Sequence, residues 1–517
     1  MRISRVVLTV LSLCCMSDAV LAGTPTRGGH GGARPTGARI EDSGTRIDIN
    51  QISMVVKNTG SFAFDTQTGS AGLEFPKGSG RTAVFAGGLW VGALVGGEPR
   101  VSVAEYSDDY RPGMAVGGVA EAPGAPALKV YKLDRVYPDA TSRDAALADY
   151  TLGAVPRGAP PVTVLGNGTL SIAGDQMLWS VFNDLGKGSA HNGAGSALPL
   201  GLEVQQTTWA YNRPGVLGNT LFMRYRLINR SANTLSQTRV SLWSDPDLGG
   251  FLDDLVGCDT TRSLGFCYNA TNTDQQYGAA PPAVGFDLLQ GPSGAGAGLT
   301  MRSFNRYVNG TDPQDSVATY NLMQGLNSDG SPQVDPISTL VTPYAVPGDP
   351  VLNQGWLDSS PSDRRMMLTS RPFTLAPGAT NELVCAIIVA QGSDRLDSVT
   401  LLKAQDQVVQ TAFDANTIGL LDAPNSAAAS LTLAAPWPNP ARGAFTVTYS
   451  LPATGSATLE LIDVAGRLVL ARALDARRAG SHTVTLDAPR ERLAAGVYFV
   501  RLAHARGQLT RRVVLMP

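Results

Sequence analysis

Five aspartates lie within a short stretch in the middle of the chain, at Asp245, Asp247, Asp253, Asp254 and Asp259. No basic residue lies among them, so in a folded loop their carboxylates would repel one another. A hard cation such as calcium, which takes oxygen ligands, would relieve that repulsion. The twelfth-position Glu of an EF-hand is missing, so we expect an irregular calcium site made of these five side chains. The alternative is that they form side-chain turns on a solvated acidic surface.

Two cysteines lie in or near this stretch. Cys258 and Cys267 are separated by a short segment that contains Gly265. An oxidising compartment outside the cell would favour a disulfide between them. Cys385 stands in an apolar strand pattern and is expected to remain a buried free thiol. No histidine lies near these cysteines in the sequence, which argues against a zinc site.

Catalysis in the central region would need groups that the sequence offers only in part. A glycosidase uses a pair of carboxylates that folding brings together. The candidates for such a pair are Glu74, Glu203, Asp245 and Asp253. A serine hydrolase needs a histidine, but His191 stands among glycines and no Gly-x-Ser-x-Gly elbow accompanies it. We therefore favour a non-enzymatic role, with a secreted glycosidase or protease as the alternative.

The charge balance and composition limit the partners and the fold. The chain has 41 basic and 43 acidic residues, a formal net charge of −2, which argues against nucleic acid as a partner. The charge is uneven, because residues 436–517 contain eleven Arg, no Lys and five acidic residues, a net charge of +6. With 57 Gly, 33 Pro and 43% apolar residues, the chain is rich in turns and apolar enough to fold. Short strands joined by many turns, that is, an all-β protein, fit this composition.

Alternating patterns indicate strands in the central region, and one segment departs from them. Residues 221–229 and 238–243 alternate apolar and polar side chains around a polar turn, which predicts a β-hairpin or meander. Residues 394–416 contain no Pro or Gly and predict a helix capped by Asp394. The face expected to be apolar carries Leu401, Val408 and Ala412.

The first residues have the order of a secretion signal. Arg2 and Arg5 precede an apolar run at residues 6–13, and small residues lead to Ala22, as in a cleavable signal peptide. The run is much shorter than the roughly 20 residues that a membrane span needs. No other charge-free apolar segment reaches that length. We therefore expect export, and no integral membrane segment after cleavage.

Short alternating runs recur from Trp437 onward and predict a compact sandwich of six or seven strands. The motifs in this segment are Pro438-Asn439-Pro440, Tyr449-Ser450-Leu451-Pro452, Asp463-Val464-Ala465-Gly466-Arg467, Gly480-Ser481-His482 and Ala495-Gly496-Val497-Tyr498-Phe499-Val500-Arg501-Leu502. In this order they resemble the type A sorting domain of type IX secretion substrates, and the related immunoglobulin-like module of flagellar hook-capping proteins is similar too. We expect Asp463 to begin a tight turn with Gly466 in the left-handed conformation, and Gly496 to allow close entry into the last hairpin.

Together these observations predict an all-β protein: one or two β-sandwich domains with a late helix, then a small C-terminal immunoglobulin-like sandwich. The expected divisions are a signal peptide at 1–22, a flexible leader at 23–45, a central β-rich region at 46–420, a linker at 421–436 and the sorting-type domain at 437–517. The central region also resembles uncharacterised exported proteins with such tails, a likeness that implies no activity. We expect a secreted or cell-surface binding or structural protein, whose partners are the secretion machinery and an extracellular glycan or protein.

Overall fold

The computed structural model describes residues 44–516 except for residues 67, 152–154, 187–190, 294–299, 416, 419–430, 434–435, 437–438, 452–454, 478–479, 488–492 and 506. The expected signal peptide, nearly all of the expected leader and most of the expected linker lie outside the described residues, as does Pro438.

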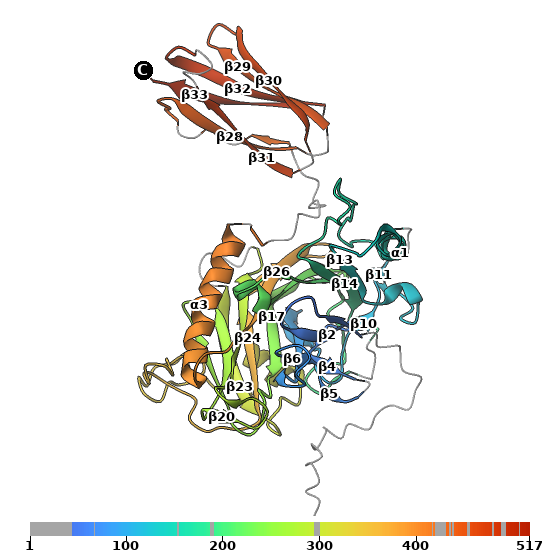
Figure 1. Ribbon diagram of the computed structural model, residues 1–517, viewed down its shortest axis with the longest axis vertical. Coiled ribbons are helices and arrows are strands. Elements are labelled where there is room, and N and C mark those ends of the chain that lie inside the picture. Colours follow the sequence, from blue (N-terminus) through green and yellow to red (C-terminus); the bar gives the residue numbers. More distant parts are fainter. Residues whose placement is uncertain are drawn as a thin grey trace, which may run out of the picture. The chain divides into compact units, whose positions relative to one another are not determined.

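Antiparallel strands dominate the body of the chain (Figure 1). Its strands are β1 (Gly44–Ile47), β2 (Ser53–Lys57), β3 (Ser61–Phe62), β4 (Phe64–Asp65), β5 (Ser70–Ala71), β6 (Leu73–Glu74), β7 (Thr82–Val84), β8 (Ala86–Val95), β9 (Glu98–Ser102), β10 (Arg111–Pro112), β11 (Ala115–Val116), β12 (Val119–Ala120), β13 (Tyr131–Asp134), β14 (Gln176–Asn183), β15 (Leu202–Ala210), β16 (Thr220–Asn229), β17 (Leu235–Asp245), β18 (Asp254–Asp259), β19 (Leu264–Asn269), β20 (Thr273–Asp274), β21 (Gly278–Ala279), β22 (Ala283–Gln290), β23 (Met301–Val308), β24 (Arg364–Ser370), β25 (Phe373–Leu375) and β26 (Thr380–Ala390). The helices are α1 (Ala140–Thr151), α2 (Ser316–Met323) and α3 (Arg395–Asp414), with short 3₁₀ turns η1 (Pro126–Leu128) and η2 (Val216–Asn219).

Two large sheets pack face to face in the body. One has 11 strands: eight follow the path β23-β24-β17-β8-β3-β2-β6-β7, and β1, β9 and β25 pair with strands of that path. The other has 9 strands: eight follow the path β10-β14-β15-β16-β26-β22-β19-β18, and β13 pairs with β14. A single buried cluster takes side chains from both, and the rings of Phe62 on β3 and Phe286 on β22 lie 6.4 Å apart across it. Burial of apolar surface between two sheets is the main stabilising term of such a sandwich. The all-β sandwich expected for the body is confirmed.

Helices cover the outer faces of both sheets. α3 packs on the 9-stranded sheet, where Val399, Leu402 and Val409 join a second buried cluster. α2 packs on the 11-stranded sheet with Tyr320 and Met323 in a third cluster. Gly92 in β8 permits this approach, because a Cβ there would lie 2.8 Å from the Met323 sulfur. Only the late helix was expected from the sequence, and α1 and α2 were not.

Two details of the expected strands and helix were wrong. β16 and β17 are consecutive but belong to different sheets, since β16 pairs with β15 and β26 while β17 pairs with β8 and β24. The chain therefore crosses the sandwich here and forms no hairpin. Asp394 does cap α3, accepting hydrogen bonds from the backbone nitrogens of Leu396 and Asp397. However, Leu401 and Val408 lie on its exposed side. Apolar residues occur around much of the helix, and the sheet packs against the neighbouring row that contains Leu402 and Val409.

The C-terminal segment has its own sheets and its own core. β27 (Thr432–Leu433), β28 (Ala444–Leu451) and β31 (Gly480–Asp487) form one sheet. β29 (Gly455–Asp463), β30 (Leu468–Arg477), β32 (Gly496–His504) and β33 (Gly507–Leu515) form the other. Their apolar side chains share one buried cluster, so the small sandwich expected here is confirmed. β27 lies within the segment expected to be a linker.

The expected disulfide between Cys258 and Cys267 is absent, and both residues are buried free thiols, as is Cys385. The register of β18 and β19 explains why. Cys258 lies opposite Gly265, and Cys267 lies opposite Val256. The two cysteines are therefore diagonal neighbours, which in a sheet lie about 7–8 Å apart, beyond the roughly 4.4–6.8 Å between Cα atoms that a disulfide spans.

We expect Cys258, Cys267 and Cys385 all to react with iodoacetamide once the protein is unfolded without a reducing agent. In the folded protein they should be unreactive, since burial raises the pKa of all three thiols well above the usual value and the thiolate is the reactive form. Peptide mass mapping of both samples makes the measurement. A peptide pair linked through Cys258 and Cys267 in the unreduced sample would contradict it.

Candidate functional site

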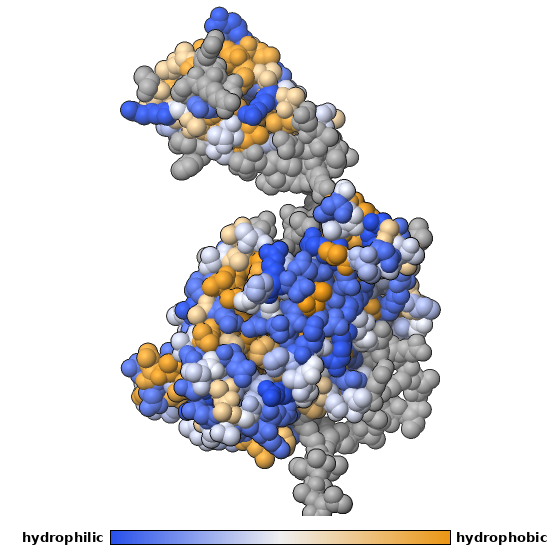
Figure 2. Space-filling view, in the orientation of Figure 1, coloured by the Kyte–Doolittle hydropathy of each residue, from blue (hydrophilic) through white to orange (hydrophobic). Residues whose placement is uncertain are grey.

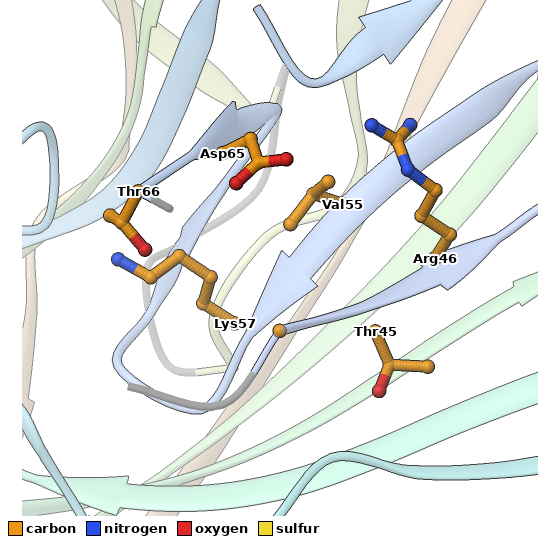
Figure 3. Close-up of a pocket in the computed structure, with 7 residues that line it drawn as sticks. Thr45, Arg46, Val55, Lys57, Asp65 and Thr66 are labelled. Carbon is orange, nitrogen blue, oxygen red and sulfur yellow. The ribbon is translucent and has the colours of Figure 1, made fainter. Parts of the chain in front are cut away.

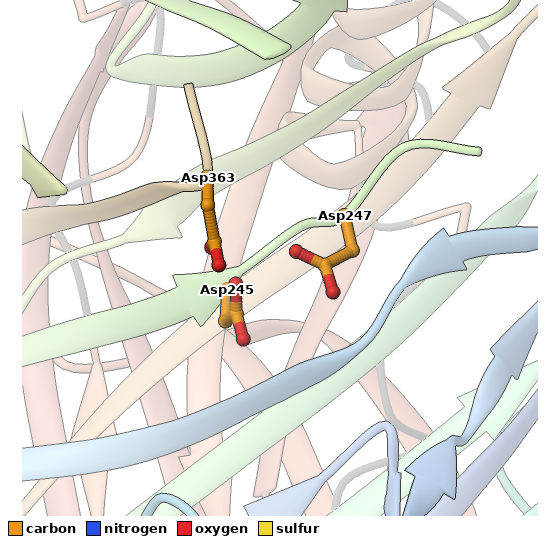
Figure 4. Close-up of side chains that lie close together, drawn as sticks. All are labelled: Asp245, Asp247 and Asp363. Carbon is orange, nitrogen blue, oxygen red and sulfur yellow. The ribbon is translucent and has the colours of Figure 1, made fainter. Parts of the chain in front are cut away.

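The structure brings together two of the five predicted calcium ligands and adds a third aspartate. Asp245 ends β17, Asp247 follows in a left-handed conformation with a φ of 42°, and Asp363 immediately precedes β24. All three are buried, and one carboxylate oxygen from each lies within 4.8 Å of the others (Figure 4). We call these three residues the acidic centre. Carboxylates at this spacing are the ligands that a hard cation takes.

A buried arginine partly neutralises the acidic centre. The Arg365 guanidinium lies 3.4 Å from Asp245 Oδ2 and 3.8 Å from Asp312 Oδ1, and it also pairs with Asp363. Its Nη2 donates to the Tyr106 hydroxyl at 3.0 Å, and that hydroxyl hydrogen-bonds to Asp245. Burial alone would lower the pKa of Arg365, but Asp245 and its neighbours outweigh that effect and hold the pKa above the usual value. The guanidinium is therefore permanently charged.

Aromatic side chains surround this charge network. The Tyr106 ring meets Trp243 and Phe64 edge-on, each with ring centroids 5.5 Å apart. Trp243 stacks on Trp90 at 5.8 Å, and its indole nitrogen donates to the Tyr307 hydroxyl at 2.7 Å. Large rings of this kind keep water out and strengthen the charge interactions beside them. The charged groups of this network are therefore buried, and they lie on the face of the 11-stranded sheet that points away from the other sheet.

The other three predicted ligands lie outside this group among the described residues. Asp253 accepts a hydrogen bond from Asn269 at 3.0 Å, and burial raises its pKa. Asp254 is fully buried, accepts from the Leu248 backbone nitrogen at 3.2 Å, and has its pKa raised well above the usual value, first by burial and then by Asp253. Asp259 accepts from the Thr261 hydroxyl at 2.6 Å and shapes the turn between β18 and β19. These three act as turn or interior residues.

The carboxylates considered for catalysis are engaged in structural contacts. Glu203 on β15 is fully buried, and its two oxygens accept from the Arg230 guanidinium at 3.0 and 3.1 Å. Glu74 accepts a hydrogen bond from the Gly80 backbone nitrogen. His191 directs its Nδ1 to the neighbouring Asn192 carbonyl.

Sequence reasoning missed Asp363, Arg365 and Tyr106. Each is far from Asp245 in the chain, and the strand order alone brings them together. A weak signal was present, since the string Asp363-Arg364-Arg365 ends a stretch after Arg306 that contains no basic residue. Successive strand residues point to opposite faces, so Arg365 reaches Asp245 while Arg364 pairs with Asp358 at 2.7 Å.

A shallow cavity of about 130 Å³ lies elsewhere, beside β1 and β2 (Figure 3). It is lined by Gly44, Thr45, Arg46, Val55, Lys57, Asp65 and Thr66. None of the predicted site residues lines it. Lys57, the buried basic residue that lines this cavity, already forms an ion pair with Asp108 at 3.2 Å.

In the C-terminal domain the predicted turn and its contacts are present. Gly466 has a φ of 80°, and Asp463 Oδ1 accepts from the backbone nitrogens of Ala465 and Arg467, both at 2.9 Å. Asn439 bonds to β33 through the Arg512 carbonyl and the Val514 nitrogen, both at 2.9 Å. The first motif therefore fastens the start of the domain to its last strand.

Tyr498 and Gly496 of the last motif lie at the start of β32. The Tyr498 hydroxyl donates to the Ala494 carbonyl at 2.9 Å, which fixes the entry into the strand. Residues 436–516 match the family model of the secretion system C-terminal sorting domain. The C-terminal domain matches the type IX secretion sorting domain. A tail of this kind makes the chain a secreted or outer cell-surface protein. None of the helices in the described part of the chain is long and apolar enough to span a bilayer.

No curated protein sequence matches the chain. Among solved structures, a polysaccharide lyase aligns with 60% of this chain and 34% of its own, at 10% identity and a TM-score of 0.19. The chain thus spans about a third of that lyase. A putative aldose 1-epimerase from Escherichia coli K12 aligns with 68% of this chain and all of its own, at 10% identity and a TM-score of 0.25. Similarities at these scores carry no argument about activity.

Apart from the acidic centre, a pair of buried carboxyl groups lies between α3 and the 9-stranded sheet. Asp406 on α3 and Asp287 on β22 are almost fully buried, and each carboxyl group acts on the pKa of the other. Burial raises the pKa of Asp406 to about 7, and burial together with Asp406 raises the pKa of Asp287 well above the usual value. Asp259 and Arg262 also act on Asp406, and Arg262 lowers its pKa. The pair therefore holds a proton between its oxygens near neutral pH.

We expect Asp406→Asn to stabilise the body at pH 8 by about 1–3 kcal/mol and to flatten its pH dependence. The folded pair binds protons that the unfolded chain releases above pH ~4. The pair's contribution to stability is therefore most favourable below that pH and falls as the pH rises through about 7. An asparagine donates the same hydrogen bond without a titrating proton. Urea unfolding followed by tryptophan fluorescence between pH 5 and pH 8 provides the measurement.

The matched control is Asp144→Asn on the exposed surface of α1, which should leave the pH dependence unchanged. If Asp406→Asn keeps the same pH slope as the unaltered protein, the pair does not share a proton.

Proposed function

We propose that the chain is a non-enzymatic binding or structural protein of the outer cell surface or extracellular space, which its C-terminal domain presents to the secretion machinery. The observation that carries the non-enzymatic part is the pairing of the central carboxylates with arginines, of which Arg365 is buried and Arg230 is partly exposed. Asp245 and Asp363 pair with Arg365, and Glu203 pairs with Arg230. These carboxylates are held in ion pairs within the fold, whereas a glycosidase needs one carboxyl group placed to protonate the leaving group.

The rival function is a secreted glycosidase or protease with a carboxylate pair. It would be favoured by hydrolysis of a polysaccharide or of casein by the purified chain that is lost on Glu203→Gln or Asp253→Asn alone. Glu203→Gln would also weaken the pair with Arg230, so a melting curve must accompany the assay. A folded variant without activity, against an active parent, would replace our proposal.

The calcium site expected from the sequence remains a proposal, now narrowed to the acidic centre. Its three carboxylates and Arg365 carry a net charge of −2, which a divalent cation would neutralise. The ligand atoms are oxygens, as calcium prefers, and they come from two segments of the chain, so an ion there would tie the end of β17 to the start of β24.

Deleting residues 437–517 should leave the body in the periplasm of its own host, because the deleted segment carries the match to the sorting family. Immunoblots of periplasm, cell surface and medium would measure the distribution. As a control, Val469→Ser alters an exposed apolar side chain of the same domain outside the motifs and should leave secretion intact. Normal surface levels of the truncated protein would refute the delivery role.

For the acidic centre, we expect millimolar calcium to raise the melting temperature relative to chelator by an amount equivalent to about 0.4–1.4 kcal/mol, for a dissociation constant of about 10⁻⁴–10⁻³ M. Asp247→Asn should abolish this shift while leaving the Arg365 pairs in place, and asparagine tolerates the left-handed backbone of this position. The matched control is Asp253→Asn, which lies outside the acidic centre and should retain the shift. No calcium effect on the unaltered protein, or an equal effect on Asp247→Asn, would exclude the site.

A further inference from the structure

The loops between β23 and β24 carry an unusual concentration of exposed apolar side chains. They are drawn in yellow to amber at the lower left of Figure 1, and Figure 2 shows hydrophobic side chains gathered there. Residues 333–342, which we call the apolar hairpin, hold Val334, Ile337, Leu340 and Val341 with exposed fractions of 48, 65, 67 and 67%. Single exposed apolar residues are ordinary, but four on one short hairpin mark an interaction surface.

Hydrogen bonds give the apolar hairpin a defined shape. Val334 and Val341 form a β-bridge, and the Thr342 nitrogen donates to the Gln333 carbonyl at 3.0 Å. The Gln333 side chain is buried and donates to the Gly325 carbonyl at 2.9 Å, which anchors the hairpin at its base.

The tip of the hairpin is held in the same way. The Asp335 carboxylate accepts from the Ile337 nitrogen and from the Ser338 hydroxyl, both at 2.8 Å. Because the turn is fixed before any partner arrives, binding through its apolar side chains would cost little conformational entropy.

A second small turn extends the apolar surface along the same loops. Asp349 caps it by accepting from the Val351 nitrogen at 2.8 Å, and the adjoining Leu352 is 63% exposed. Asp349 also pairs with Lys403 of α3 at 3.1 Å, which fastens this turn to the helix.

Acidic residues dominate the segment that carries the apolar hairpin. Between Arg306 and Arg364 the chain contains seven aspartates and no Lys, Arg or His, and four of them (Asp312, Asp349, Asp358 and Asp363) pair with basic residues of other segments. Asp329, in the loop before the hairpin, is exposed, and hydrogen bonds from Ser331 lower its pKa. Asp335 lies on the hairpin itself, and the hydrogen bond from the Ile337 nitrogen lowers its pKa. An apolar surface with an acidic rim attracts a partner that is apolar at its centre and basic at its edge.

We propose that the apolar hairpin is a docking surface for a protein segment that presents aliphatic side chains flanked by Lys or Arg. This inference rests on the binding role proposed above. The acidic rim decides between occupants. An anionic lipid surface would be repelled, since membrane-binding loops draw on basic residues next to their apolar ones.

The experiment compares two synthetic peptides on the full mature chain by fluorescence anisotropy. One alternates leucine and lysine, and the other alternates leucine and glutamate. We expect the lysine peptide to bind, the glutamate peptide not to bind, and the double variant Ile337→Ser with Leu340→Ser to weaken lysine-peptide binding by about tenfold or more. Both substituted side chains are exposed, so the melting temperature should not change. The matched control, Val116→Ser with Val119→Ser, alters two exposed residues of another hairpin, β11–β12, and should bind normally.

The other outcomes each overturn the proposal. If the lysine peptide binds the hairpin variant as tightly as the unaltered chain, or binds neither, the apolar hairpin is not a docking surface. Such a result would leave the proposed surface location and non-enzymatic role standing, because the secretion and hydrolysis experiments test those independently. Binding to vesicles of phosphatidylcholine and phosphatidylglycerol that the hairpin variant loses would assign the surface to a membrane. Self-association on size-exclusion chromatography that the same variant abolishes would assign it to a second copy of the chain.

Discussion

The interior charge of Arg365 is the constraint to which the outer side of the 11-stranded sheet is adapted. Its guanidinium joins the end of β17, the start of β24 and the loop that carries Tyr106. Removing a charge of this kind would leave several carboxylates buried without compensation, at a cost of about 3–5 kcal/mol. The rings of Trp243 and Tyr106 pack beside the network, and the burial of Asp245 and Arg365 strengthens both the attraction and the penalty for breaking it. The strand order, the aromatic cluster and the acidic centre therefore depend on one another.

The interior acids of the body are held in different ways. Burial is the main cause that raises the pKa of Asp254 well above its usual value and the pKa of Glu105 to about 8. Asp287 and Asp406, whose pKa values burial also raises, face each other beneath α3 and are almost fully buried. Asp245 and Asp363 of the acidic centre are instead paired with Arg365. One pair of interior acids thus lies between α3 and the 9-stranded sheet, and the acidic centre lies between the end of β17 and the start of β24.

Local chemistry could be predicted from the sequence, and the meeting of distant segments could not. The Asp463 turn, the Asp394 cap and the all-β class follow from residue type and spacing within a few positions. The hairpin expected after residue 221 was wrong because alternation reports a half-buried strand and not its partner. Asp363 joined Asp245 only through the pairing of β17 with β24, and the expected disulfide failed on an offset of two residues in register. The first two errors concern long-range pairing, on which a single sequence carries little signal, and the third concerns the register of the local pair β18 and β19.

Export sets a final condition on where reactive groups can lie. In an oxidising compartment an exposed thiol is oxidised or forms mixed disulfides, at a rate set by its thiolate fraction. Cys258, Cys267 and Cys385 avoid this because burial keeps them protonated. The three aspartates of the acidic centre are likewise buried. The loops between β23 and β24 do the opposite, since they expose aliphatic side chains on a turn that hydrogen bonds hold in place. Aliphatic groups are chemically inert outside the cell, so a surface built from them can recognise a partner by shape and apolar contact without exposing a group that oxidation or hydrolysis would destroy.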